Sequence, residues 1–488
     1  MKKNKYLCLI LAMLMTGAAL PACGETAETE TTSGNNEDQT TAAETRRDEL
    51  PDVNYGGNEF NILCRTEMSY EFDVEQDGDI VNDAEYERNR SVEERFGVDF
   101  NYHKVNGGWD DRSIFLNTLT GSVLAGDGAY DMVAGYEAYM TGPATEGYFL
   151  NILDMKNIDP DATWWSDKWT DSMTVNDQLY MITGDIAISL WDNIYCMFFN
   201  KKLSEEFDIG DLYEVVKNGE WTIDKLYEVS GKVSEDVDGD GKFTKYDMYG
   251  FASSDDNHAR AWGIPCEIKI ASRDEDGFMK MTYNSERTQN VLEKLVKLYD
   301  ARSTYKHFNE FNSPYMLVDG PNMFKDGRAL IASSFLKIAA VLRGMDTDFG
   351  IIPIPKYDEI QEDYHTTVHD STTVICFPKT INDPDMSGLI AEALCVYSHY
   401  DVIPEYYEIS LKTKSSRDTE SEAMIDLIRD SLMFNFGEMY SVMLDGALGL
   451  LGNTIIAGSS KFASRYASVE KKFEANLEKI NEAYGKNQ

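Results

Sequence analysis

Between residues 59 and 134 the sequence alternates between patterns typical of strands and patterns typical of helices. Strand-like apolar runs lie at 59–64, 98–102 and 130–134, and helix-like periodicity lies between them at 82–96 and 113–125. This alternation predicts a parallel sheet with helical crossovers, and such sheets bind ligands at the carboxyl ends of their strands. The first helix should begin at Asn82 or Asp83 and end at Gly97.

Later segments continue the mixed α/β pattern. Further strands are expected at 178–182, 194–199, 329–332, 348–352 and 372–377, and amphipathic helices at 223–233 and 289–299. The end of the chain is predicted to be mainly helical, with helices at 389–397, 422–432 and 461–484.

The chain begins with the pattern of a secretory signal. Three lysines within the first five residues precede an apolar stretch that ends at Leu20, and the sequence Leu-Pro-Ala-Cys closes it at Cys23. We interpret residues 1–22 as a signal peptide. The segment resembles the signals of bacterial lipoproteins, which implies that Cys23 is a lipidation site and anchors the protein to the extracellular face of the cell membrane. Residues 23–50 contain no aromatic and almost no aliphatic side chain, which predicts a flexible lipid-anchored linker.

The formal net charge of −40 excludes partners of the same sign. Nucleic acid phosphates would be repelled, so no nucleic acid partner is expected, and electrostatic adsorption to anionic lipids is disfavoured as well. Cysteines remain in the body of the chain at Cys64, Cys196, Cys266, Cys376 and Cys395. An odd number without close spacing predicts buried thiols rather than a disulfide framework.

Several segments together resemble one known family. They are 82–98, 125–136, 177–202 (DQLYMITGDIAISLWDNIYCMFFNKK), 324–335 and 348–355. In this order they are similar to segments of the extracellular solute-binding proteins of bacterial ABC importers (family 1, maltose-binding-protein-like lipoproteins). The resemblance implies an α/β, two-lobed periplasmic-binding-protein-like fold (type II), with lobes joined by hinge strands and a helical C-terminal part. It places lobe 1 at 55–197 and 333–400, and lobe 2 at 198–332 and 401–488.

The resemblance also implies that a carbohydrate, either a sugar or an oligosaccharide, binds in the interlobe cleft and passes to the permease subunits of an ABC transporter. The protein is expected to be a monomer and not an enzyme. Because sugars present flat apolar faces rimmed by hydroxyls, their sites need aromatic side chains beside Asp, Asn, Glu and Arg. Loops at strand ends hold such groups, and we expect ligand contacts from Arg65, Glu67, Tyr136, Glu137, Trp191, Asp192, Asn193, Asp256, Asn257, Trp262, Ser334, Phe335 and Phe436.

Other interpretations remain open at this point. A surface carbohydrate sensor that is not coupled to transport would share the same features, and a secreted glycoside hydrolase is compatible with the many carboxylates. The sequence contains neither a His-Glu-x-x-His motif nor a Gly-x-Ser-x-Gly elbow. His365 and His369 have a metal-like spacing, but the Thr-Thr-Val between them favours an extended chain. The tryptophan cluster suits packing as well as ligand contact; it comprises Trp164, Trp165 and Trp169.

One loop matches a calcium-binding pattern. In the stretch 236–247, carboxylates fall at loop positions 1, 3 and 5, glycine at 6 and a carboxylate at 12, which is the layout of an EF-hand loop. We therefore predict a structural Ca²⁺ whose ligands come from Asp236, Asp238, Asp240, Lys242 (through its carbonyl), Thr244 and Asp247. Asp247 stands where the pattern has glutamate, and its shorter side chain makes a bidentate contact harder.

Overall fold

The computed structural model describes residues 49–488 except 254–255, 307–318, 414–417, 460 and 486–488. The expected signal peptide, the lipidation site Cys23 and the linker up to residue 48 lie outside the described residues. Leu50–Gln488 forms the larger of two compact units and contains every helix and strand given below. None of the described helices combines the length and the apolar character needed to cross a membrane.

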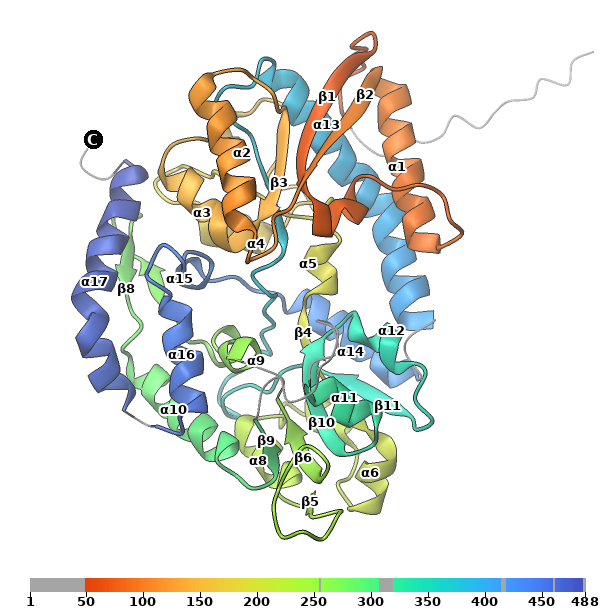
Figure 1. The fold of residues 1–488 in the computed structure, drawn as a ribbon, viewed down its shortest axis with the longest axis vertical. Helices are drawn as coiled ribbons and strands as arrows, with labels where there is room; N and C mark the ends of the chain where they lie inside the picture. The colour runs from red at the N-terminus through yellow and green to blue at the C-terminus, as the bar shows by residue number, and fades with distance from the viewer. Residues whose placement is uncertain (1–48, 254–255, 307–318, 414–417, 460, 486–488) are drawn as a thin grey trace, which may run out of the picture. The chain divides into compact units, whose positions relative to one another are not determined.

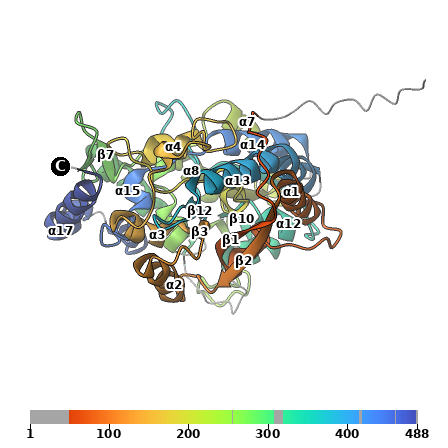
Figure 2. The same ribbon diagram turned by 90° about the horizontal axis from the view of Figure 1, so that it is seen from above.

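The first sheet has its strands in the order β12-β3-β1-β2. Strand β1 (Asn58–Arg65) pairs in parallel with β2 (Val98–Val105) and with β3 (Met132–Tyr136), and β12 (Thr373–Cys376) is antiparallel to β3. Helices α1 (Ile80–Phe96) and α2 (Arg112–Ala125) form the crossovers and lie on opposite faces of the sheet (Figure 2). The predicted parallel sheet with helical crossovers is therefore confirmed.

Helix α1 begins earlier than expected. The carboxylate of Asp79 accepts hydrogen bonds from the N–H groups of Val81 and Asn82, at 3.0 and 3.3 Å, and so caps the first turn. The predicted start at Asn82 or Asp83 is wrong, because this earlier aspartate supplies the cap. The predicted end is confirmed, since Gly97 adopts a φ of 60° there and terminates the helix.

The second sheet has the order β11-β4-β10-β6-β5, with β9 also paired to β6. Its central strand β10 is antiparallel to β4 and parallel to β6. The members are β4 (Tyr195–Asn200), β5 (Ser234–Glu235), β6 (Met248–Ala252), β9 (Thr304–Tyr305), β10 (Ala329–Phe335) and β11 (Phe349–Ile352).

Two expectations about these segments need correction. The range 333–400 was assigned to lobe 1, but β11 pairs antiparallel with β4 and so belongs to the second sheet. The chain returns to the first sheet only with β12. The strand expected at 178–182 does not form; Gln178 and Ile182 make only isolated β-bridges, to Val175 and Ile375.

Helices cover both sheets, and a short hairpin, β7 (Ala271–Arg273) and β8 (Met279–Met281), stands apart from them (Figure 1). Besides α1 and α2, the helices before β12 are α3 (Glu137–Thr145), α4 (Asp167–Met173), α5 (Ser189–Asp192), α6 (Lys201–Glu206), α7 (Leu212–Lys217), α8 (Ile223–Ser230), α9 (Asp256–Arg260), α10 (Glu286–Tyr299), α11 (Asp319–Lys325) and α12 (Ile338–Leu342).

After β12 the described chain is helical, as expected. The helices in this part are α13 (Pro384–Tyr397), the π-helical segments η4 (Ser398–Val402) and η5 (Glu405–Thr413), α14 (Thr419–Asp430), α15 (Phe436–Met439), α16 (Ala447–Ile456) and α17 (Phe462–Ala483). This part contacts elements of both lobes: α13 packs against α1 and α14 against β11, while α15 touches both α3 and β7.

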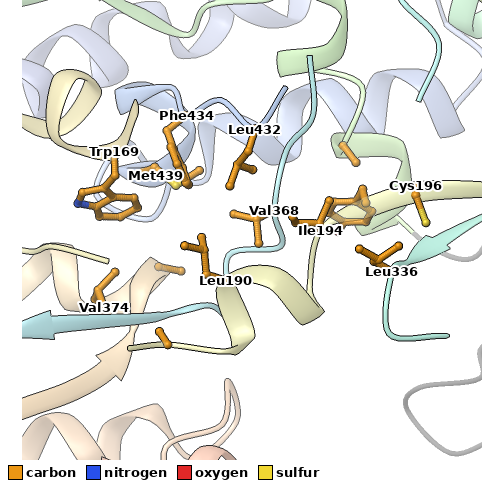
Figure 3. Close-up of a cluster of buried hydrophobic side chains, with 14 of the residues drawn as sticks. Trp169, Leu190, Ile194, Cys196, Leu336, Val368, Val374, Leu432, Phe434 and Met439 are labelled. Carbon is orange, nitrogen blue, oxygen red and sulfur yellow. The ribbon is translucent and has the colours of Figure 1, made fainter. Parts of the chain in front are cut away.

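An apolar core continues through the region where the chain passes between the two sheets. Ile194 forms a β-bridge with Val368, and both side chains are buried. Leu190, Leu432 and Trp169 continue this cluster toward the first sheet, as Figure 3 shows. The segments around Ile194 and Val368, which run between the two sheets, are called the connecting passages below. They are held by ordinary core packing rather than left as loose linkers.

The interpretation of the cysteines as buried thiols is confirmed. All five described cysteines are free and buried. Burial raises the pKa of the Cys64 thiol to about 12, so this side chain stays protonated.

The packing of β6 on α8 gives a test of the second lobe. A Cβ at Gly250 would lie 1.9 Å from the carbonyl oxygen of Ser230, a backbone atom that cannot move aside. We expect Gly250→Ala to lower the free energy of unfolding by about 1–3 kcal/mol or more, measured by urea denaturation. Gly121→Ala on the exposed face of α2 is the control, because a Cβ there meets nothing within 4 Å. It should raise stability by up to about 1 kcal/mol. Equal urea midpoints for Gly250→Ala and the parent would contradict the described packing.

Candidate functional site

Arg65, the last residue of β1, is fixed at the carboxyl edge of the first sheet. Its Nη2 donates to the carbonyl of Ser371 and to the hydroxyl of Thr373, both at 2.8 Å. Its guanidinium carbon lies 5.0 Å from the centre of the Tyr136 ring, and the Tyr136 hydroxyl donates to Asp370 at 3.1 Å. The ends of β1 and β3 and the start of β12 thus bring the predicted residues Arg65 and Tyr136 together.

The loop after β2 adds an exposed aromatic side chain to this edge. The predicted residue Glu67 accepts hydrogen bonds from the N–H of Gly107, at 3.1 Å to Oε2 and 3.3 Å to Oε1, and so holds the loop. Trp109 follows in the same loop, is 44% exposed, and its ring centre lies 6.1 Å from that of Tyr136. Trp109 therefore offers an aromatic surface beside Tyr136.

A second aromatic cluster lies at the carboxyl end of β10 in the other sheet. The predicted residue Phe335 ends β10 and pairs in register with Tyr195, the first residue of β4, with ring centres 4.9 Å apart. The rings of His258 and His369 each lie 5.4 Å from Phe335. Because His369 precedes Asp370, the two clusters meet along the connecting passage.

Asn193 joins the connecting passages. Its Nδ2 donates to the hydroxyl of Ser371 at 3.3 Å, and its Oδ1 accepts from Nζ of Lys337 at 2.7 Å. The neighbouring Asp192 accepts from the Tyr406 hydroxyl at 2.8 Å, which directs its carboxylate toward η5. Burial lowers the pKa of Lys337, and the nearby carboxylate of Asp192 opposes that shift.

A pocket lies beside His369 and Asp370, where α9 and α15 approach the connecting passage. The predicted residue Asn257 contributes to its wall and accepts a hydrogen bond from Arg260. Asp256 begins α9, and its side chain lies outside the described residues. The lining residues are Tyr195, Asn257, Arg260, Ala261, Thr367, Val368, His369, Asp370, Glu438, Met439 and Leu448.

Three of the residues predicted to contact the ligand are buried. Trp262 is 1% exposed and donates from Nε1 to the Tyr299 hydroxyl at 3.1 Å. Phe436 is buried and stacks on Tyr440 with ring centres 4.1 Å apart. Ser334 is buried within β10. All three side chains are buried in this structure, and ligand contact by them stays a prediction.

Trp191 also lies apart from the Arg65–Tyr136 cluster. Its Nε1 donates to Asp185 at 3.0 Å, and its ring centre lies 5.6 Å from that of Tyr407. It lines a different pocket, shared with Trp164 and with residues of η4 and α14. Trp165 and Trp169 are buried, which favours the packing interpretation of these two.

Sequence reasoning missed several residues that the structure brings to the site. Trp109 and Asp370 lie in the loop after β2 and just before β12, so the rule used for the other strand ends could have found them. Tyr195 and His258 come within reach only through the pairing of β4 with β10 and the position of α9. Glu438 carries no local signal, since it lies on a short helix far along the chain.

The His365–His369 spacing does not gather a metal site. Nε2 of His365 lies 3.5 Å from a carboxylate oxygen of Glu267, whereas Nδ1 of His369 lies 2.9 Å from the Ser371 hydroxyl. Over the described ranges, the metal-compatible group of side chains is Asp236, Asp238 and Asp240.

The protein has a two-lobed periplasmic-binding-protein-like fold. Its two sheets are joined by packed connecting passages, and polar and aromatic groups lie at the strand ends. Solved structures share this fold at low sequence identity. The chain is 13% identical to an ABC transporter solute-binding protein from Thermotoga lettingae bound with α-D-tagatose, covering 88% of this chain and 100% of that one at a TM-score of 0.52. It is 14% identical to the cyclic α-maltosyl-1,6-maltose binding protein of Arthrobacter globiformis. That match covers 88% of this chain and 100% of the other chain, at a TM-score of 0.55.

A third structure has the same fold. The galacto-N-biose/lacto-N-biose I-binding protein of Bifidobacterium longum, in complex with lacto-N-biose, is 11% identical and covers 87% of this chain and 98% of its own at a TM-score of 0.55. No family model matches the chain, and no curated protein sequence matches it. At these identities the likeness establishes the fold.

The calcium-like loop is preorganised by its own backbone hydrogen bonds. Carboxylate oxygens of Asp236, Asp238 and Asp240 lie within 4.8 Å of one another. Asp236 accepts from the N–H of Gly241 at 2.8 Å, and Gly241 adopts a φ of 81°, which favours glycine. The ring of Phe243 packs edge-on against Tyr249, with ring centres 5.7 Å apart, and so attaches the loop to β6.

Asp247 has a different environment from the other three aspartates. Its buried carboxylate accepts from the N–H groups of Thr244 and Val237, at 2.7 and 2.9 Å. Burial alone would raise its pKa, but these hydrogen bonds outweigh burial and lower it. Asp247 thus closes the loop, and the structure gathers only three of the four predicted carboxylates.

Calcium binding by this loop stays a prediction with a direct test. Calcium should raise the melting temperature of the protein, and chelation should lower it, because an ion would screen the repulsion among three clustered carboxylates. Asp238→Ala combined with Asp240→Ala should abolish this sensitivity, whereas Asp276→Ala, in the separate Asp-Gly turn between β7 and β8, should not. Absence of calorimetric binding up to several millimolar calcium, with melting indifferent to chelator, would refute the prediction.

Proposed function

We propose that this protein is a lipid-anchored extracellular solute-binding protein that captures a carbohydrate between its lobes and delivers it to an ABC permease. The observation that carries the proposal is the meeting of two aromatic and polar clusters along one connecting passage. Tyr136 and Trp109 belong to the first sheet, Phe335 and Tyr195 to the second, and the segment at His369 and Asp370 touches both clusters.

The chemistry of these clusters suits a sugar. An aromatic ring stacks on the apolar face of a pyranose, while carboxylates and amides bind its rim of hydroxyls. Trp109 is exposed and Phe335 is half-buried, and Asp370 and Asn257 lie near them with polar groups. The three solved structures are of proteins that bind α-D-tagatose, cyclic α-maltosyl-1,6-maltose and lacto-N-biose, which supports the same class of ligand for this chain.

A two-lobed protein of this kind works by closing on its ligand. Each lobe provides part of the contacts, so only the closed form has all of them, and the ligand shifts the population toward that form. Tyr195 lies where the chain enters the second sheet, and Phe335 pairs with it at the end of β10. A small change in the connecting passages would therefore move the Phe335 cluster relative to the Tyr136 cluster.

The aromatic groups give the first test of this function. Trp109→Ala and Phe335→Ala should each weaken carbohydrate binding by about 1–3 kcal/mol, because each removes a stacking surface. Titration calorimetry with a carbohydrate identified in a thermal-shift screen measures this. The control is Tyr148→Ala, because the Tyr148 carbonyl accepts from Lys379 at 2.8 Å, which places this half-buried tyrosine at the opposite edge of the first sheet. Unchanged affinity in both site variants would remove these side chains from the site.

Anchoring has a separate test. Lipidation of Cys23 would keep the binding protein close to its permease, which raises the effective concentration of one for the other. Cys23→Ala should release the protein into the medium or leave it unprocessed, as seen by fractionation and mass spectrometry. Cys8→Ala, within the apolar stretch before the cleavage site, is the matched control and should stay membrane-bound. A Cys23→Ala protein that is processed and retained like the parent would contradict the anchor.

A further inference from the structure

Two buried carboxyl groups beside the pocket have oxygens without a hydrogen-bond partner. Glu438 on α15 is 4% exposed, lines the pocket, and its Oε1 has no partner among the described residues. Glu137, the first residue of α3, is 1% exposed, and neither of its carboxylate oxygens has one. A buried carboxyl group without a partner is costly, so such groups in a binding pocket indicate a missing partner.

The backbone around Glu438 leaves room for its carboxyl group. A Cβ at position 263 would lie 2.2 Å from Oε1 of Glu438, so Gly263 provides space that any other residue would fill. The charged and titratable groups that face Glu438 come from every neighbouring element; they are Arg260, His369, Asp370, Tyr195, Glu137 and Tyr283. This set holds two carboxyl groups, one guanidinium, one imidazole and two phenols.

Each basic group near the pocket makes at least one hydrogen bond within the protein. Arg65 donates to Ser371 and Thr373, and Lys337 donates to Asn193. Arg260 donates to the side chain of Asn257. An anionic part of a ligand in this pocket would lie beside the carboxylate of Asp370.

Burial also decides the charge of Glu438. Burial raises the pKa of Glu438 to about 8. Burial also raises the pKa of Glu137, and the nearby carboxyl groups of Asp370 and Glu438 raise it further. At neutral pH the Glu438 side chain is therefore a carboxylic acid, which donates one hydrogen bond and accepts others. A sugar hydroxyl needs the same combination.

We propose that this pocket holds an uncharged, hydroxyl-bearing part of the ligand through Glu438, and that the protein rejects saccharides carrying a carboxylate group. This inference rests on the proposed function and narrows it, because neutral sugars, sugar acids and oligosaccharides all fit the aromatic clusters alone. It assigns Glu438 a specificity role that its position in the sequence does not suggest.

The first experiment compares matched probes. Calorimetry and thermal shift on the full chain would use neutral maltotriose, cellotriose and galactobiose, and anionic digalacturonate and glucuronate-terminated disaccharides. A neutral probe should bind at least tenfold more tightly than its uronate counterpart. Tighter binding of a uronate overturns this inference and leaves the proposed function standing. Binding of no saccharide from a broad panel overturns the proposed function itself.

The second experiment tests Glu438 directly. Glu438→Gln should keep the affinity for the neutral probe within about twofold at pH 6.5, because the amide also donates and accepts. Glu438→Ala should lose at least tenfold. In the parent, affinity should fall as pH rises through about 8, where Glu438 ionises beside Asp370, and this fall should be absent in Glu438→Gln. Glu474→Gln, exposed on α17, is the control and should behave like the parent. Unchanged affinity in Glu438→Ala, or the same pH dependence in Glu438→Gln, refutes the assignment.

A measurement without ligand shows whether Glu438 is buried and protonated as described. Its pKa is raised from 4.5 to about 8 on folding, so the folded state holds more protons than the unfolded state between these values. The stability that this group contributes is present below pH 4.5 and is lost as pH rises through about 8. The melting temperature should therefore fall less steeply over this window in Glu438→Gln than in the parent. Equal slopes would show that Glu438 is not protonated in the folded protein and would overturn the proposal.

Discussion

The packing of the connecting passages against one another is the contact on which the rest of the structure depends. Ile194 bridges Val368 and Ile182 bridges Ile375, with all four side chains buried. Leu432 closes this core from the C-terminal part. Because backbone pairing fixes the direction of neighbouring side chains, these bridges also orient the residues next to them in sequence. Asn193, Tyr195, His369 and Asp370 are such residues, so one apolar contact both joins the sheets and positions the candidate site.

The parts of the fold that could be predicted from sequence are those with a local signal. The alternation from β1 to β3 depends on hydrophobic periods of two and about 3.6 residues, and each period is visible within a short window. Partners distant in sequence were not predictable in this way. Phe349–Ile352 was assigned to the wrong lobe because its pairing partner β4 lies some 150 residues earlier, and nothing local to the strand identifies it.

The candidate site could be predicted only in part, because the sequence does not show which distant segments pack together. Arg65, Tyr136 and Phe335 were found because they end strands, and strand ends of an α/β sheet gather at one edge. Trp262 and Phe436 share the residue type of a sugar platform but are buried by elements that pack around them only in the folded chain. Trp109 stayed exposed because its loop extends beyond the sheet, held by Glu67. Residue type predicted the chemistry, and only tertiary packing decided which side chains remain accessible.

The position of α15 and α16 late in the chain has a consequence for the timing of folding. Both sheets are complete once β12 has been made, yet the pocket wall still lacks Glu438, Met439 and Leu448. A chain that ends before α15 would therefore contain the strands of both sheets but only part of the pocket wall. The strands can pair without this last segment, whereas the pocket is complete only after the whole chain has folded.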